Sequence, residues 1–245
     1  MTHVSKKNTC CTCIWIVALI FILSSCAHLQ KGSYISADIT AESDRTENIS
    51  WHSCSFRITW PEGSAPDLDV DLLLAHAVIG PVLDTYEERL KFWRFHRRAS
   101  RDEAGHLFSF IFFTNQGSAK YIKEMITVSN RVRQLKSENI IEELSCDNVT
   151  HWSGPDITDT SDQNWSFSVQ KNWPFFIMGV SKLWLGLIED ALPEFKEDQL
   201  AIRQLLDEYR KANRIVTNIW QKEGQHAFLH HLNAVFGYES LLIRY

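Results

Sequence analysis

Two histidines near the C-terminus have the spacing of metal ligands. His226 and His230 are four residues apart in a stretch with helical periodicity, so both side chains face the same side of the helix. Zinc proteases use this spacing, but they place a glutamate directly after the first histidine and take a third ligand from elsewhere. That glutamate is absent here. We therefore predict no cofactor, with both histidines forming hydrogen bonds between helices and sheet. The alternative is a zinc site with His226 and His230 as weak candidate ligands.

A group of basic residues lies in the middle of the chain. Arg94, His96 and Arg98 alternate along a predicted strand, so they share one face, and His106 can pair with them across a predicted hairpin. Arg57 could join them from the first strand if the faces match. Such a cluster suits a carboxylate, a phosphate or an anionic glycan. The alternative is that these residues form ion pairs with the acidic turn that follows or with the C-terminal helices.

Five tryptophans flank the predicted junction between the two halves of the chain. They are able to form an aromatic platform for a glycan or a peptide, and the alternative is ordinary packing in the core or at an interface. These residues are Trp51, Trp60, Trp152, Trp165 and Trp173.

The N-terminus has the pattern of an export signal. Lys6 and Lys7 precede a short apolar run from Ile14 to Leu23, and the small residues Ser24 and Ser25 follow it. The run is shorter than the roughly 20 apolar residues that cross a bilayer. The sequence Leu23-Ser24-Ser25-Cys26 resembles the lipobox of bacterial lipoproteins. The alternative is an uncleaved N-terminal anchor helix with an incidental cysteine.

The resemblance to lipoprotein precursors implies where the protein is held. In that family the cysteine, here Cys26, is lipidated and becomes the first mature residue. Its acyl chains then anchor the protein in a membrane, which requires more than one chain. An aspartate after the cysteine tends to retain such proteins at the inner membrane, and this chain has Ala27. The expectation is a lipid anchor facing the periplasm, at the outer membrane rather than the inner one.

Charge and cysteine content fit an exported binding protein. The whole chain has a net charge of −5, and its first 25 residues hold two lysines and no acids, so the remainder carries −7. This argues against nucleic acid as a partner, because phosphate backbones require a basic face. Of the six cysteines, only Cys54 and Cys146 are neither removed with the signal nor acylated. We predict that they form a disulfide, with two buried thiols as the alternative.

Hydrophobic periodicity predicts an α+β fold. The expected order is a strand at 54–60, a helix at 69–90 interrupted at Gly80-Pro81, strands at 91–99 and 106–114, a helix at 119–137 capped by Ser118, and a strand at 140–146. This βαββαβ order resembles the ferredoxin-like antiparallel sheet. In that fold the first and last strands are antiparallel neighbours, which would place Cys54 beside Cys146.

The second half of the chain is predicted to be helical and to pack on the sheet. Helices are expected at 172–190 and 193–222, and a last one at 225–236, with Gly224 and Gly237 as stops. The first of these is nearly all apolar and is expected to be well buried. The predicted organisation is a signal peptide (1–25), a lipidated N-terminus and tether (26–50), an α+β unit (51–148), a linker (149–164) and a helical segment (165–245).

No catalytic signature is recognisable in the sequence: it has no nucleophile elbow, phosphate loop or dinucleotide fingerprint. We therefore expect a non-catalytic binding protein that contacts an envelope protein or cell-wall component through the seam between sheet and helices. The alternative is a small envelope enzyme that uses His96, His106, His226 and His230 at this seam, with or without a metal.

Overall fold

The computed structural model describes residues 49–148, 157–193 and 200–241. These residues belong to one compact unit, Thr46–Tyr245. The predicted signal peptide, the lipidation site Cys26 and nearly all of the predicted tether lie outside the described residues, and so does the first half of the predicted linker. The tether was expected to extend to residue 50, whereas the first strand already begins at Ile49.

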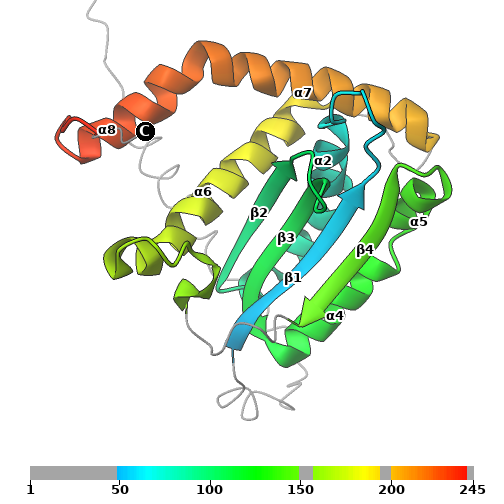
Figure 1. The fold of residues 1–245 in the computed structure, drawn as a ribbon, viewed down its shortest axis with the longest axis horizontal. Helices are drawn as coiled ribbons and strands as arrows, with labels where there is room; N and C mark the ends of the chain where they lie inside the picture. The colour runs from blue at the N-terminus through cyan, green and yellow to red at the C-terminus, as the bar shows by residue number, and fades with distance from the viewer. Residues whose placement is uncertain (1–48, 149–156, 194–199, 242–245) are drawn as a thin grey trace, which may run out of the picture. The chain divides into compact units, whose positions relative to one another are not determined.

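The protein is α+β, with an antiparallel sheet of four strands in the part of the chain that is described (Figure 1). The strand order is β2-β3-β1-β4, so β1 lies between β3 and β4 and pairs with both. β2 and β4 are the edges. The strands are β1 (Ile49–Ile58), β2 (Phe92–Ala99), β3 (His106–Asn115) and β4 (Ile141–Asn148).

A disulfide joins the first and last strands of this sheet. Cys54 of β1 and Cys146 of β4 are directly opposite in the register, with Cα atoms 4.1 Å apart, and their sulfur atoms are bonded. Cys54 is completely buried in the core. The predicted disulfide and the predicted antiparallel pairing of these two strands are both confirmed.

Short helices connect the strands on one face of the sheet. β1 is followed by α2, a π-helical segment η1, α3 and a 3-10 turn η2, which span Asp69–Leu73, Leu74–Ile79, Gly80–Tyr86 and Glu87–Arg89. The π-helical segment ends at Ile79, two residues before Pro81, which has no backbone N–H to donate to a preceding carbonyl. β3 is followed by α4 (Gln116–Thr127) and α5 (Asn130–Ser137). The expected helix at 119–137 is thus two helices.

The main core lies between the sheet and these helices. Alternate residues of the three strands β1, β2 and β3 point into it, including Phe56, Phe95, Phe108 and Phe110, and meet apolar side chains from α2 to α5. The opposite face of the sheet carries a smaller apolar cluster at one end. Trp51, Phe92, Ile111 and Phe113 form this cluster, and Ile157 and Met178 pack against it.

The C-terminal helices pack against edge strand β2 and against α2. A short 3-10 segment η3 is followed by a long helix α6, then by α7, a π-helical segment η5 and α8; their bounds are Ile157–Thr160, Phe167–Ala191, Ile202–Gly224, Gln225–His230 and His231–Val235. Figure 1 shows α6 alongside β2, and α7 along the top of the view, beyond the ends of the strands. Among the described residues no helix is long and apolar enough to span a bilayer.

Two expectations about these helices are wrong. α6 was expected to be well buried, but only Pro174, Ser181 and Ile188 of its 25 residues are fully buried. Gly224 was expected to stop a helix, but the chain continues through it into η5 with helical backbone angles. A methyl group at this position would lie 2.9 Å from Cε3 of Trp220, so glycine makes room for the indole. Gly237, with φ +69°, follows the last helix as expected.

Candidate functional site

A large apolar groove lies between α6, the edge of β2, and α7 with the segments η5 and α8 that follow it. It has a volume of about 710 Å³. Six of its apolar side chains are between 41 and 56% exposed, and together they form a contiguous exposed apolar patch, which marks interaction sites. They are Phe176, Val180, Leu183, Trp220, Leu229 and Leu232. We call this hollow the seam groove, because it follows the seam between sheet and helices.

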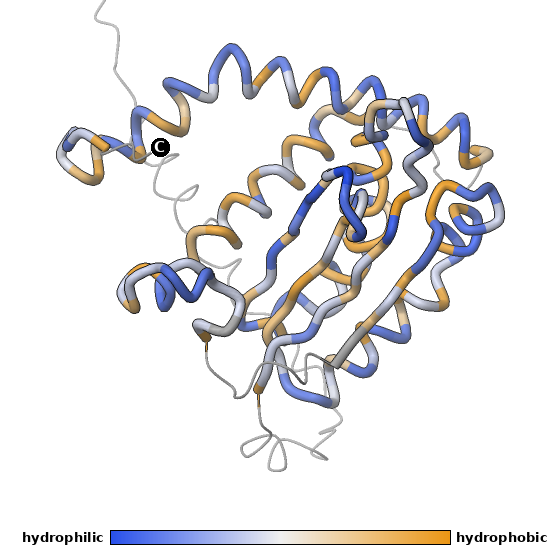
Figure 2. Tube along the Cα trace, viewed as in Figure 1, coloured by the Kyte–Doolittle hydropathy of each residue, from blue (hydrophilic) through white to orange (hydrophobic). Residues whose placement is uncertain are grey.

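One wall of the seam groove is a face of α6. Phe176, Val180 and Leu183 follow at steps of four and three residues, so they stand above one another on the helix, and Trp173 and Trp184 lie on the same side. Figure 2 shows apolar residues along much of α6. The helix begins at a cap in which the side chain of Ser166 accepts a hydrogen bond from the N–H of Val169. The wall therefore belongs to a regular, capped helix.

The other wall comes from α7 and the π-helical turn after it. Val216 and Trp220 lie one turn apart on α7, Phe228 and Leu229 lie within η5, and Leu232 lies in α8. Trp220 stacks on Phe228 with ring centroids 6.1 Å apart. Gly224 lies between them in sequence and leaves the space that the indole occupies. This glycine thus shapes the groove.

The groove is closed along its third side by β2. Because β2 is an edge strand, the N–H of Phe95 has no partner within the sheet, and it donates to the Ser181 hydroxyl of α6 at 3.1 Å. Ser181 donates in turn to the carbonyl of Ile177 at 2.8 Å. This contact fixes α6 against the sheet edge and removes one open strand position.

Two basic residues of β2 line the groove without an acidic partner. Arg94 is half-buried, donates from Nη2 to the carbonyl of Thr160 at 3.3 Å, and has a buried Nε without a hydrogen-bond partner in the described residues. Burial lowers the pKa of Arg94 to about 10, so the guanidinium is charged at neutral pH. Desolvation, followed by the charges of Arg94 and Arg98, lowers the pKa of His96.

A third basic residue in the groove is held by a buried carboxylate. Arg97 donates from Nε to Asp71 Oδ2 at 2.8 Å, and its guanidinium lies 4.6 Å from the ring centre of Trp184. The other oxygen of Asp71 is 3.0 Å from Nε2 of His106. The side chains of Asp71 and His106 are fully buried, and Nδ1 of His106 has no partner in the described residues. Because neither ring nitrogen reaches solvent, we interpret this network as structural.

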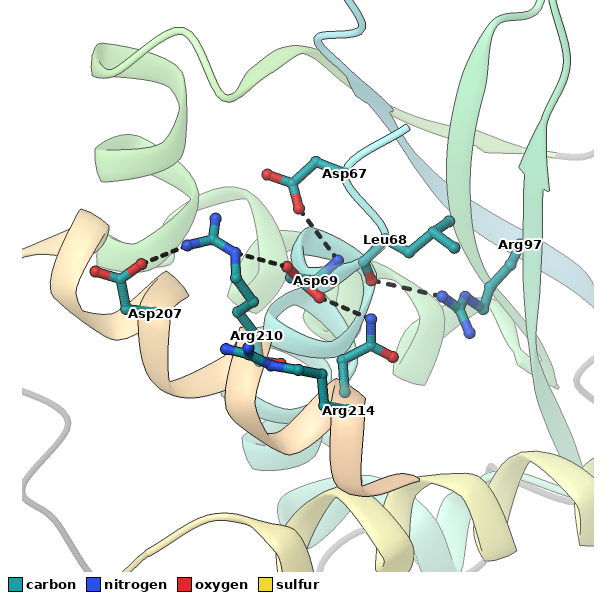
Figure 3. A network of polar contacts seen from close by, with 8 residues as sticks. Asp67, Leu68, Asp69, Arg97, Asp207, Arg210 and Arg214 are labelled. Atoms are coloured by element: carbon teal, nitrogen blue, oxygen red, sulfur yellow. Dashed lines mark hydrogen bonds and ion pairs between the residues drawn. The ribbon is translucent and has the colours of Figure 1, made fainter. Parts of the chain in front are cut away.

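Polar contacts also fix α7 against α2 behind the groove. Asp69 of α2 accepts from Arg210 Nε at 3.2 Å and from Asn213 Nδ2 at 2.7 Å. Figure 3 shows Arg210 between the carboxylates of Asp69 and Asp207, with dashed lines to both. Asn213 is itself part of the groove lining. The orientation of the α7 wall is thus set by a specific pairing as well as by apolar packing.

The structure places four residues of the predicted basic cluster on one face of the sheet and the fifth, His106, on the other. Arg94, His96 and Arg98 share one face of the sheet, and Arg57 is on the same face, because Arg98 and Arg57 are both opposite Leu107. Arg98 pairs with Asp102, and Arg57 donates to the carbonyls of the β2–β3 turn. The alternative, ion pairing with the acidic turn, therefore holds for Arg98, whereas Arg57 reaches this turn through backbone carbonyls only. His106 is on the other face, pointing into the core.

The remaining predicted site residues lie outside the groove. His226 and His230 stack with ring centroids 5.2 Å apart, and His231 approaches both. No group of three histidine, cysteine or acidic side chains in the described residues has the arrangement of a metal site. His96 lines the groove, whereas His106, His226 and His230 do not, so the four histidines of the alternative enzyme are not brought together.

Sequence reasoning located the seam but missed most residues that form the groove. Of the five tryptophans considered as a platform only Trp173 lines the groove; Trp51 is buried, and Trp152 lies outside the described residues. The signal was present in the nearly uninterrupted apolar composition of α6, which was taken as a sign of burial. A helix that is apolar on more sides than the core can cover indicates a binding surface, and α6 is such a helix.

Comparisons with known proteins identify no relative. No protein-family model matches the chain, and no curated protein or solved structure is significantly similar to it.

Proposed function

We propose that this protein is a lipid-anchored binding protein of the bacterial envelope, which takes an apolar ligand into the seam groove without catalysing a reaction. The observation that carries the proposal is the groove itself. Large apolar side chains from α6, α7, η5 and α8 converge on it and remain partly exposed. Its volume lies in the range of about 300–1,000 Å³ that is typical of small-molecule sites, which are likewise mostly apolar with few polar groups.

A neutral dye tests whether the groove binds apolar molecules. N-phenyl-1-naphthylamine brightens when it leaves water, so we expect a saturable fluorescence increase with the purified protein. Leu183→Asp places a carboxylate on the α6 wall and should weaken binding roughly ten-fold, since each 1.4 kcal/mol changes the affinity by that factor. Leu183 is 42% exposed, so the fold should tolerate the change.

The matched control makes the same chemical change elsewhere. Val128, 60% exposed and between α4 and α5, does not line the groove. Val128→Asp should leave dye binding unchanged. Equal losses in both variants, or no saturable binding by the parent protein, would refute a ligand site in the groove.

The lipid anchor is a separate part of the proposal. It is supported by the lipobox Leu23-Ser24-Ser25-Cys26, and the disulfide is compatible with an oxidising compartment. Cells that express the full chain should incorporate radiolabelled palmitate into this protein, and Cys26→Ser should abolish the label. Label that persists in Cys26→Ser would place the acylation elsewhere.

We also propose that residues 51–148 adopt the ferredoxin-like version of the α+β fold. The support is the βαββαβ order of the elements, together with antiparallel neighbours in the order β2-β3-β1-β4. Fold class alone says nothing about the ligand, because many functions use this arrangement. An experimental structure with a different connection between β1 and β2 would overturn it.

A further inference from the structure

We propose that the ligand of the seam groove is a long-chain fatty acid, with its alkyl chain between α6 and α7 and its carboxylate at Arg94 and His96. This inference rests on the proposed function of the groove and adds the chemical class of its ligand.

All ionisable side chains of the groove are basic. Arg94, His96 and Arg97 are its ionisable members, and none of the described residues that line it is acidic. The chain as a whole has 30 acidic residues against 25 basic ones, so the absence of acids from the lining runs against its composition. A groove with apolar walls and a cationic side is complementary to an amphiphile with an anionic head group.

Arg94 is the cation that is left without a counter-charge. Arg97 is paired with the buried Asp71, and Arg98, the other arginine on the same face of β2 as Arg94, is paired with Asp102. Arg94 donates only to a backbone carbonyl, and no acidic side chain of the described residues pairs with it. A partly desolvated guanidinium gains most from a carboxylate, which accepts two parallel N–H···O bonds. The carboxylate of a ligand would supply this partner.

The volume of the groove can enclose a slender chain, whereas a peptide helix could enter it with one face only. A helix with side chains is about 10–12 Å wide, so two turns fill roughly 1,000 Å³. The groove offers about 710 Å³. An alkyl chain has no polar groups along its length and therefore loses no hydrogen bonds to water on entering a site lined by aromatic and aliphatic side chains.

Three tryptophans allow the inference to be tested directly. Trp173, Trp184 and Trp220 line the groove, and bromine atoms quench indole fluorescence at short range. The mature protein is titrated, below micelle-forming concentrations, with a bromostearic acid and with its methyl ester, which has the same chain and bromine position but no charge. We expect both to quench and the acid to bind at least ten-fold more tightly.

Variants separate the head-group contact from the groove. Arg94→Gln should remove the preference for the acid while the ester still binds with its original affinity, which also reports that the groove is folded. Arg133→Gln, which removes an exposed arginine of α5 outside the groove, should keep the preference.

The outcomes distinguish the two proposals. Equal affinities for acid and ester, unaffected by Arg94→Gln, would overturn the fatty-acid inference and leave the apolar binding function in place. If neither compound quenches, while an amphipathic acidic peptide displaces N-phenyl-1-naphthylamine, the ligand is a peptide and the inference is wrong. If neither compound quenches and the dye does not bind, both proposals fail.

Discussion

Reducing the disulfide is the perturbation whose effect the structure determines most closely. Cys54 and Cys146 join the first and last strands of the sheet and are 92 residues apart in sequence. Reduction changes no side chain other than the two thiols. It therefore isolates the effect of the cross-link from the packing of the core around Cys54.

The expected loss of stability follows from the length of the closed loop. A cross-link restricts the unfolded chain by an entropy that grows with the logarithm of loop length, and a loop of this size gives about 4.6 kcal/mol at 25 °C. The dependence of unfolding free energy on urea is roughly 2 kcal/mol per molar for a chain of this size. Reduction should thus lower the urea midpoint by about 2 M.

The assay compares urea unfolding of the oxidised and reduced protein by tryptophan fluorescence. Because the bond is buried, the reduced samples are first unfolded in urea in the presence of a phosphine reductant. They are then refolded by dilution into buffer that contains the same reductant. The double variant Cys54→Ala/Cys146→Ala serves as the control, and its midpoint should not respond to reductant. If thiol titration shows full reduction and the wild-type midpoint moves by less than a quarter of the expected shift, the loop-closure reasoning is refuted.

Two further predictions concern buried polar groups. Asp71→Asn removes the negative charge that contacts both Arg97 and His106. It should lower the free energy of unfolding by about 3 kcal/mol, the lower end of the range for a broken buried pair, because Arg97 is a third exposed. The same change at the exposed Asp84, Asp84→Asn, should have almost no effect. The pKa of His52 is lowered from 6.5 to about 4, and the main cause is desolvation by burial. The unfolded chain therefore binds a proton at His52 before the folded one does, and up to roughly 3 kcal/mol of stability is lost as the pH falls from 6.5 to 4. Urea midpoints at pH 7 and pH 4.5 should differ less in His52→Gln, and an unchanged difference would contradict this assignment.

The sheet was predictable from the sequence because its signals are local and repeat every two residues. Alternation marked the strands at 54–60 and 91–99, and a strongly apolar run marked the one at 106–114. The order of the elements then predicted that the first and last strands are neighbours, and the observed register places Cys54 opposite Cys146 as a disulfide requires. Arg57 was expected to share a face with Arg98 only if the strand faces matched, and the register places both on that face. His106 was expected to pair with the basic residues of β2, but it lies opposite Ala99, and its side chain is on the core face of the sheet.

Helix boundaries were less predictable because competing signals lie close together. Ser118 was expected to cap the helix after β3, but Asn115 does so: its side chain accepts a hydrogen bond from the N–H of Ser118 at 2.8 Å. Both residue types are good caps, and three positions separate them. Gly224 resembled a stop for a similar reason. Its actual role depends on the indole of Trp220, one turn earlier, which only the folded structure brings into contact.

The misjudged burial of α6 leads back to the function. An apolar helix is expected to be buried because leaving large apolar side chains in water is unfavourable by about 1.5–3 kcal/mol each. In α6 the core takes Ile188 and part of Trp184, whereas Phe176, Val180 and Leu183 remain partly exposed in the groove. Replacing these three with polar residues would remove that unfavourable exposure without opening a cavity, so the fold does not require them. Their presence is explained if another molecule covers them, and the basic edge of β2 beside them indicates that this molecule carries a negative charge.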